Sequence, residues 1–190
     1  SGSQRMINRI KKGLRVDQVR EVNPRLAQAD IRPIFSFMGG MPGETIEDMK
    51  DTVQLMELLL RENPAAYVGG VGLYAAYPGT EMFDECVRHG FEPPTTFEGW
   101  AQVHLVSAPR PWLKPEELRF ARRLGVCTLV LDTKRNPRAS RFLEALRRLY
   151  SRIVRWRCRH RFFAFMPEVH LREWRWLRLT AKRPHDLTPQ

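Results

Sequence analysis

The chain has 190 residues, 43% of them hydrophobic and 28% charged, which is typical of a globular protein of about one domain. No run approaches 18 apolar residues, so the sequence predicts no membrane-spanning helix. The formal net charge of +11 is unevenly placed, because residues 134–183 hold 16 Lys and Arg against three acidic residues, a net charge of +13. The basic character therefore belongs to the last quarter of the chain.

Cys86, Cys127 and Cys158 lie 41 and 31 residues apart. This spacing fits neither the disulfide framework of a small secreted protein nor a local metal-binding knuckle. We interpret the cysteines as reduced thiols, which predicts a cytoplasmic protein. The five histidines share no ligand spacing, and the sequence predicts no metal ligands.

The opening segment predicts two helices. Ser3 is placed to cap a short helix over 4–12 that Gly13 ends. A second helix is expected from Asp17, with a break at Asn23-Pro24 and a restart in which Asn23 is the cap and Pro24 the first helical residue.

A strand, a helix and a second strand follow in direct succession. The apolar runs 31–38 and 67–76 have the length and composition of strands. Between them, residues 45–61 begin like a capping box and keep an apolar residue every three or four positions. A βαβ unit of this kind predicts two parallel strands joined by a right-handed crossover.

Both predicted strands end in a Pro-Gly turn that leads into a helix. The first turn is "MPGET" (41–45), and the second is "YPGT" (77–80), followed by a helix over 81–89. The carboxyl ends of parallel strands share one edge of the sheet, where α/β proteins bind their ligands. Two such turns on one edge therefore indicate a binding site, although each alone is also explained as a tight connection.

The last part of the chain reads as helical and strongly basic. After a Pro-rich stretch with Trp100 and Trp112 as anchors, helices are expected over 116–131 and 138–163, and another after "MPE" (166–168). In the 138–163 helix an apolar row alternates with a row of arginines; the apolar residues are Phe142, Leu146, Leu149, Ile153 and Trp156. Three interpretations stay open: an amphipathic helix packed on the domain with a solvated basic face, an anionic membrane surface, or nucleic acid.

Four stretches, read in order, resemble the second half of a radical S-adenosylmethionine enzyme, most closely the class with a cobalamin-binding domain. They are "SGSQRMINRIKKG", "FSFMGGMPGET", "NPAAYVGGVGLYAAYPGT" and "GFEPPTTFEGW". The resemblance covers residues 1–112 well and the arginine-rich helices more loosely. It implies an α/β fold: the carboxyl-terminal part of a partial parallel β/α barrel over 1–98, an Arg-rich helical extension over 99–183 and a disordered tail over 184–190.

The resemblance also implies where S-adenosylmethionine would lie. Met38 and Gly40 would lie under the adenine, with Tyr77 and Pro78 at its edge. Ser1 would lie near the ribose or the methionine carboxylate. Pro42, Gly43 and Glu44, in the turn after the first strand, would also lie at the cofactor.

Glu44 has two interpretations, capping its own helix or touching the ligand. Thr45 and Thr80 are interpreted as helix caps, and the two prolines as turn-formers.

The family's Cys-x-x-x-Cys-x-x-Cys loop for the [4Fe–4S] cluster is absent from this sequence, as is the glutamate expected before Ser1. The expectation is therefore a fragment of a cobalamin-dependent radical enzyme that is inactive alone, with the cluster and cobalamin held elsewhere in the parent protein. The alternative is a non-enzymatic module, cytoplasmic or membrane-peripheral, whose helix over Arg138–Arg161 binds an anionic membrane or, less favoured, nucleic acid.

Overall fold

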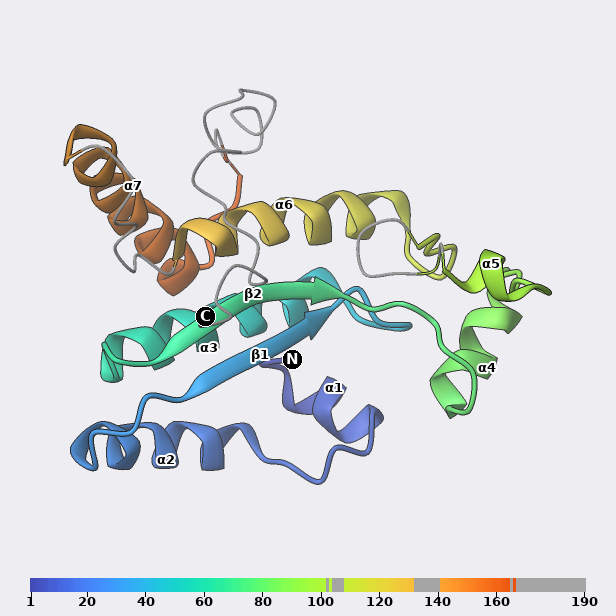
Figure 1. Cartoon of the computed structure of the whole chain (residues 1–190), viewed down its shortest axis with the longest axis horizontal. Coiled ribbons are helices and arrows are strands. Elements are labelled where there is room, and N and C mark those ends of the chain that lie inside the picture. The colour runs from blue at the N-terminus through green and yellow to red at the C-terminus, as the bar shows by residue number, and fades with distance from the viewer. Residues whose placement is uncertain (102, 104–107, 132–140, 165, 167–190) are drawn as a thin grey trace, which may run out of the picture.

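The computed structural model describes residues 1–101, 103, 108–131, 141–164 and 166. Over these residues helices pack on one face of two parallel strands and beside them (Figure 1). The elements in chain order are α1 (Gln4–Arg9), α2 (Val16–Gln28), β1 (Ile34–Gly39), α3 (Ile46–Glu62), β2 (Tyr67–Leu73), α4 (Glu81–Arg88), α5 (Phe97–Trp100), α6 (Pro115–Leu131) and α7 (Arg141–His160).

The βαβ unit is confirmed. β1 and β2 pair in parallel, with Ile34 opposite Tyr67 and Gly39 opposite Leu73. Thr45 caps α3, since its side chain accepts the N–H of Asp48 while Asp48 accepts the N–H of Thr45. β2 ends three residues earlier than predicted, at Leu73.

The main core lies between one face of this small sheet and the helices α3, α6 and α7. The exposed fraction is 2% or less for Met56 from α3, Leu124 from α6 and Val154 from α7. α6 also runs along the outer edge of β2, where the Thr128 hydroxyl accepts the N–H of Val71 at 3.3 Å (Figure 1). This contact satisfies a donor that an edge strand would otherwise present to solvent.

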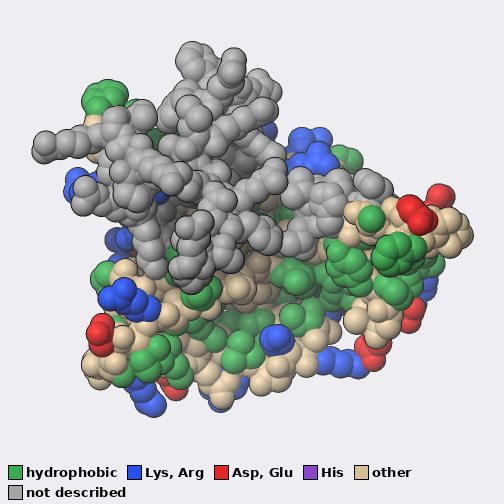
Figure 2. Space-filling view, viewed as in Figure 1, with side chains coloured by type: hydrophobic (Ala, Val, Ile, Leu, Met, Phe, Trp, Pro, Cys, Tyr) green, Lys and Arg blue, Asp and Glu red, His purple; other side chains and the backbone are tan. Residues whose placement is uncertain are grey.

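No helix of the described part of the chain covers the opposite face of the sheet (Figure 1). Side chains alternate in and out along β1, so Ile34 is 72% exposed and Met38 is 42% exposed, and Tyr67 begins β2 on the exposed side. Seen from this side, hydrophobic side chains gather over the strands (Figure 2). The two strands alone do not test the expected barrel, which stays a prediction.

Two predictions about the first helices were wrong. α1 ends at Arg9 rather than residue 12, and the chain already turns at Lys11, which has a φ of 51°. α2 is one continuous helix with Pro24 inside it. Asn23 is fully buried and donates its side-chain N–H to the carbonyl of Leu59 at 3.0 Å, so a contact with α3 holds the helix together at the proline.

The basic helix packs on the domain, but the apolar row is not the side that packs. α7 packs on α3 and α6 through Val154, Cys158 and Ser151, which are all buried. The apolar row that begins at Phe142 is exposed instead. Residues 138–140, the helix predicted after 168 and the tail 184–190 lie outside the described residues.

Within the described part of the chain, no helix has both the length and the apolar character needed to cross a bilayer.

Candidate functional site

The turn after β1 is held by contacts from distant parts of the chain. Gly40 and Gly43 have φ values of 72° and 70°, a conformation that side chains with a Cβ rarely adopt. The carbonyl of Gly39 accepts the N–H of Tyr74 at 2.8 Å, and the carbonyl of Gly40 accepts the indole N–H of Trp112 at 2.9 Å. The turn is therefore fixed, and these two carbonyls are already engaged.

Glu44 closes this turn from inside. Its side chain is almost fully buried, and its Oε2 accepts the N–H of Met41 at 3.1 Å, while Oε1 has no hydrogen-bond partner among the described residues. The carboxyl group borders a small cavity together with Gly39, Gly40, Thr52 and Val71. Burial raises the pKa of Glu44 to about 7, although backbone N–H groups of Met41 and Gly40 oppose the shift.

Glu44 therefore does not cap α3, a role that belongs to Thr45. Its carboxyl group instead folds back into the turn at the end of β1. Since it is near its pKa at neutral pH, it is a buried group that can hold or release a proton.

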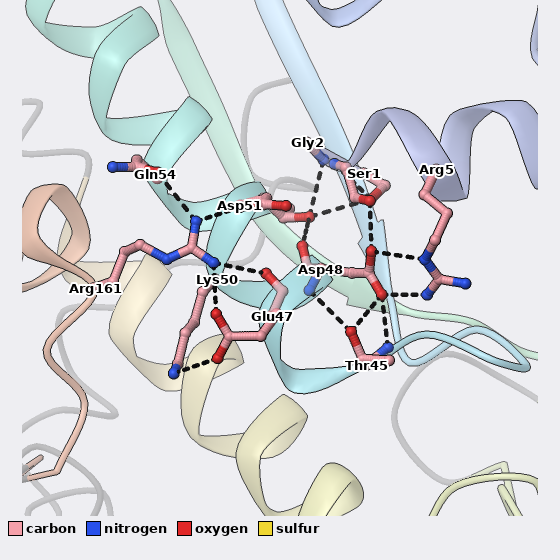
Figure 3. A network of polar contacts seen from close by, with 12 residues as sticks. Ser1, Gly2, Arg5, Thr45, Glu47, Asp48, Lys50, Asp51, Gln54 and Arg161 are labelled. Carbon is pink, nitrogen blue, oxygen red and sulfur yellow. Dashed lines mark hydrogen bonds and ion pairs between the residues drawn. The ribbon is translucent and has the colours of Figure 1, made fainter.

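Asp48 ties the start of α3 to the first residues of the chain (Figure 3). Its Oδ1 accepts the hydroxyl of Ser3 at 2.5 Å, and its Oδ2 accepts the N–H of Thr45 at 2.8 Å and pairs with the guanidinium of Arg5. Burial alone would raise the pKa of Asp48, but the hydrogen bonds from Arg5, Ser3 and Thr45 outweigh it and hold the pKa well below its ordinary value. Arg5 also donates to the carbonyl of Gly43 at 2.8 Å, so the same cluster supports the turn.

Ser1 and Gly2 approach α3 one turn further along. The N–H of Gly2 donates to the Thr52 hydroxyl at 2.9 Å, and the Ser1 hydroxyl lies 3.2 Å from the same atom. A Cβ on Gly2 would lie 2.6 Å from the backbone of Asp51 and Thr52, so only glycine fits this approach.

Arg161, just after α7, forms a second cluster on the other side of α3 (Figure 3). Its guanidinium pairs with Asp51 and with Glu47, the latter at 2.8 Å. Glu57, whose side chain is 2% exposed, pairs with Arg159 at 2.6 Å. These pairs bind the carboxyl end of α7 to the outer side of α3.

The turn after β2 is more open. Thr80 caps α4 by accepting the N–H of Phe83 at 3.1 Å, and the hydroxyl of Tyr77 donates to the carbonyl of Val103 at 2.8 Å. Tyr77 is nevertheless 50% exposed, and Pro78 beside it is exposed as well.

The predicted site residues thus divide into two groups. Met38, Tyr77 and Pro78 are exposed, whereas Gly40, Pro42 and Glu44 are buried inside the turn. Gly43 is exposed, with the Arg9 guanidinium 3.2 Å from where its Cβ would be. Ser1 reaches the same cavity as Glu44 through Thr52.

Sequence reasoning missed Arg110. This buried arginine donates from Nε to the carbonyl of Tyr74 at 2.9 Å and from a terminal nitrogen to the carbonyl of Ala108 at 2.7 Å, at the carboxyl end of β2. Burial lowers its pKa. It lies between prolines in an irregular stretch, so no periodic pattern could have identified it.

The cysteines do not form a cluster site. All three are buried free thiols, and burial raises the pKa of Cys86 to about 12. Across the residues that the structure describes, no three His, Cys, Asp or Glu side chains are grouped as metal ligands. The residues that the structure describes therefore do not fit an iron–sulfur cluster.

No family model matches the chain. It is similar to curated proteins named tRNA-2-methylthio-N(6)-dimethylallyladenosine synthase: 34% identical over 86 residues in Shewanella sp. (strain ANA-3), and 31% over 86 residues in Shewanella woodyi and in Shewanella frigidimarina. The match covers 44% of this chain and 17% of each relative, so it spans about a sixth of their length. This similarity supports the radical S-adenosylmethionine part of the resemblance and gives no support to the cobalamin-associated class.

Proposed function

We propose that this chain supplies part of the S-adenosylmethionine site of a radical enzyme, at the edge where β1 and β2 end. The proposal rests on one observation: two parallel strands end side by side, and each is followed a few residues later by a Pro-Gly turn, with exposed apolar side chains near that edge. Weak similarity to the tRNA-modifying synthases points in the same direction. The open face of the sheet is also compatible with a partial barrel, in which further strands would stand opposite it.

The residues of the two turns would have different tasks at such a site. Met38 and Tyr77 present exposed apolar surface against which a purine ring could lie. The carbonyls of Gly39 and Gly40 already accept hydrogen bonds from Tyr74 and Trp112, so they would hold the shape of the edge.

Glu44 and Pro42 are buried, so their part would be to fix the turn, with Glu44 as a proton-holding group behind it. S-adenosylmethionine, if bound here beside a reduced cluster held by other residues, would supply a radical for removing hydrogen from an unactivated carbon.

The substrate class is proposed from the relatives alone. Their name describes a methylthio-modified adenosine in tRNA, which would make a tRNA nucleoside the substrate and methylthio transfer the reaction. The names of these relatives give no support to cobalamin dependence. The cluster ligands would come from residues other than the buried cysteines.

The test is a binding map with S-adenosylhomocysteine, which has the adenosine and lacks the reactive methyl group. In amide NMR spectra of the 190-residue chain, we expect ligand-dependent shifts at residues 38–44 and 72–78. Met38→Gln should weaken the binding.

Ile34→Gln is the matched control, since Ile34 is an exposed apolar residue on the same face of β1 at the opposite end of the strand, and it should leave binding unchanged. Shifts confined to other regions, or equal weakening by both variants, would overturn the proposal.

A further inference from the structure

α7 exposes a continuous apolar row to solvent. Its members recur at alternating spacings of four and three residues, which places them on one side of a helix. Their exposed fractions are 76% for Phe142, 41% for Leu146, 57% for Leu149, 49% for Ile153 and 52% for Trp156. Phe162, which is 47% exposed, continues the row by packing its ring edge-on against Trp156. We call these six residues the α7 row.

The opposite side of α7 is anchored to the body of the protein. Val154 and Cys158 are fully buried in the main core, and Arg159 pairs with the buried Glu57. The α7 row therefore points away from the core. A rotation of the helix that buried the row would expose Val154 and Cys158. Single exposed apolar residues are ordinary, but a contiguous row of this size marks an interaction surface.

Basic residues border the α7 row on one side. Arg148 and Arg152 are exposed, and Arg155, half-buried, donates to the carbonyl of Leu131 at 3.4 Å. The sequence of α7 holds seven arginines and one acidic residue, Glu144. An apolar row bordered by arginines and containing a tryptophan has the chemistry of a helix that lies in the plane of an anionic lipid surface.

Charge distinguishes this partner from a second copy of the chain. Two α7 rows packed together would bring two sets of arginines close to one another, and like charges at such a seam are unfavourable. An anionic bilayer takes up the apolar side chains in its acyl region and offers phosphates to the flanking arginines. The centre of the surface is aliphatic, whereas nucleic-acid surfaces place charge and stacking rings there.

We propose that α7 docks this protein on an anionic lipid bilayer, with the α7 row inserted in the headgroup region and Arg148 and Arg152 on lipid phosphates. This surface is separate from the strand-end site, so it can hold whether or not that site binds S-adenosylmethionine. Arg159 is not among the lipid-facing groups, because its charge is paired with Glu57.

The test is co-sedimentation of the 190-residue chain with vesicles of equal parts phosphatidylserine and phosphatidylcholine. Leu149→Gln, Ile153→Gln and Trp156→Gln together should lower the affinity more than 100-fold, since each large apolar side chain contributes roughly tenfold. Arg148→Gln with Arg152→Gln should lower it about 30-fold at low salt, from about fivefold for each arginine. The wild-type affinity should also fall as salt is raised, and the arginine variant should show a smaller salt dependence.

Matched controls carry the same changes at exposed positions elsewhere. Val22→Gln, Ile31→Gln and Phe97→Gln replace exposed apolar residues, and Arg25→Gln with Arg88→Gln replaces exposed arginines. Both controls should bind vesicles like the wild type, and circular dichroism should be the same for all variants.

Three results would overturn the proposal. The first is equal binding to vesicles of phosphatidylcholine alone, and the second is a dimer in sedimentation equilibrium that the triple apolar variant dissociates. The third is that the wild-type chain binds an RNA oligonucleotide and the arginine variant does not, while both bind vesicles equally.

Discussion

The two Pro-Gly turns look alike in sequence and differ in their surroundings. Each has a glycine with positive φ, Gly43 at 70° and Gly79 at 92°, and each is followed by a threonine that caps the next helix. The turn at 41–45 is enclosed by Trp112, Arg5 and Asp48, whereas Gly79 has nothing within 4 Å of where its Cβ would be. Identical local chemistry can therefore serve a buried, fixed turn and an open one.

The difference shows that long-range contacts, not the motif, make the first turn rigid. Residues more than 30 positions away in the sequence supply its hydrogen bonds. If the strand-end edge is a ligand site, the buried turn is its fixed side and the open turn is the side able to adapt.

The largest effect should follow from removing the Asp48 carboxylate. Asp48→Asn breaks the pairing with Arg5 and weakens the bonds to Ser3 and Thr45 in a mostly buried setting, so we expect the free energy of unfolding at pH 7 to fall by about 3 kcal/mol. Urea denaturation followed by circular dichroism measures this. Because the folded-state pKa of Asp48 is lowered, its stabilising contribution is present above the ordinary Asp pKa of about 4 and is lost as the pH falls below it. The variant should lack that part of the acid dependence.

The open turn supplies the control. Asp84→Asn removes an exposed carboxylate from the first turn of α4, and it should change the free energy of unfolding by no more than about 0.5 kcal/mol. Equal losses from the two variants would show that the surroundings of the turns do not matter.

An intermediate effect is expected at Glu44. Its folded-state pKa of about 7 is above the unfolded value, so the protonated form is favoured in the fold and stability declines as the pH rises from about 4.5 to about 7. Glu44→Gln removes the charge, and it should raise the free energy of unfolding by about 2 kcal/mol at pH 8 while leaving it nearly unchanged at pH 4. Urea titrations at the two pH values measure the difference. A variant equally stabilised at both would show that the carboxyl group does not titrate in this range.

Local rules in the sequence predicted the βαβ unit and the side-chain caps Ser3, Thr45 and Thr80, because these depend on neighbours within a few residues. The predicted break at Pro24 was wrong because a distant contact supports the helix there. Asn23 donates a hydrogen bond to Leu59 of α3, 36 residues away.

The spacing of apolar residues in α7 could not predict which side of the helix faces the core. The row beginning at Phe142 has the spacing of a core-facing row, yet the buried side of α7 is set by Val154 and Cys158 and by the pair between Arg159 and Glu57. At the candidate site, the glycines and prolines of the turns were foreseeable. The contacts of Trp112 with the first turn and of Arg110 with the end of β2 were not, since both residues lie in a stretch without a repeating pattern.

The smallest effect, and the closest comparison, is between the glycines of the two turns. Gly43→Ala and Gly79→Ala both place a Cβ on a residue with positive φ, which costs about 1–2 kcal/mol in either turn. At Gly43 the new methyl group would also lie 3.2 Å from the guanidinium of Arg9, the flexible end of a side chain that can move aside, whereas at Gly79 it would meet nothing. We therefore expect the two losses, measured by urea denaturation, to agree within about 0.5 kcal/mol, with Gly43→Ala the greater. A much larger loss at Gly43 would mean that Arg9 is held rigidly by its pair with Glu85, and that the first turn is enclosed on its exposed side as well.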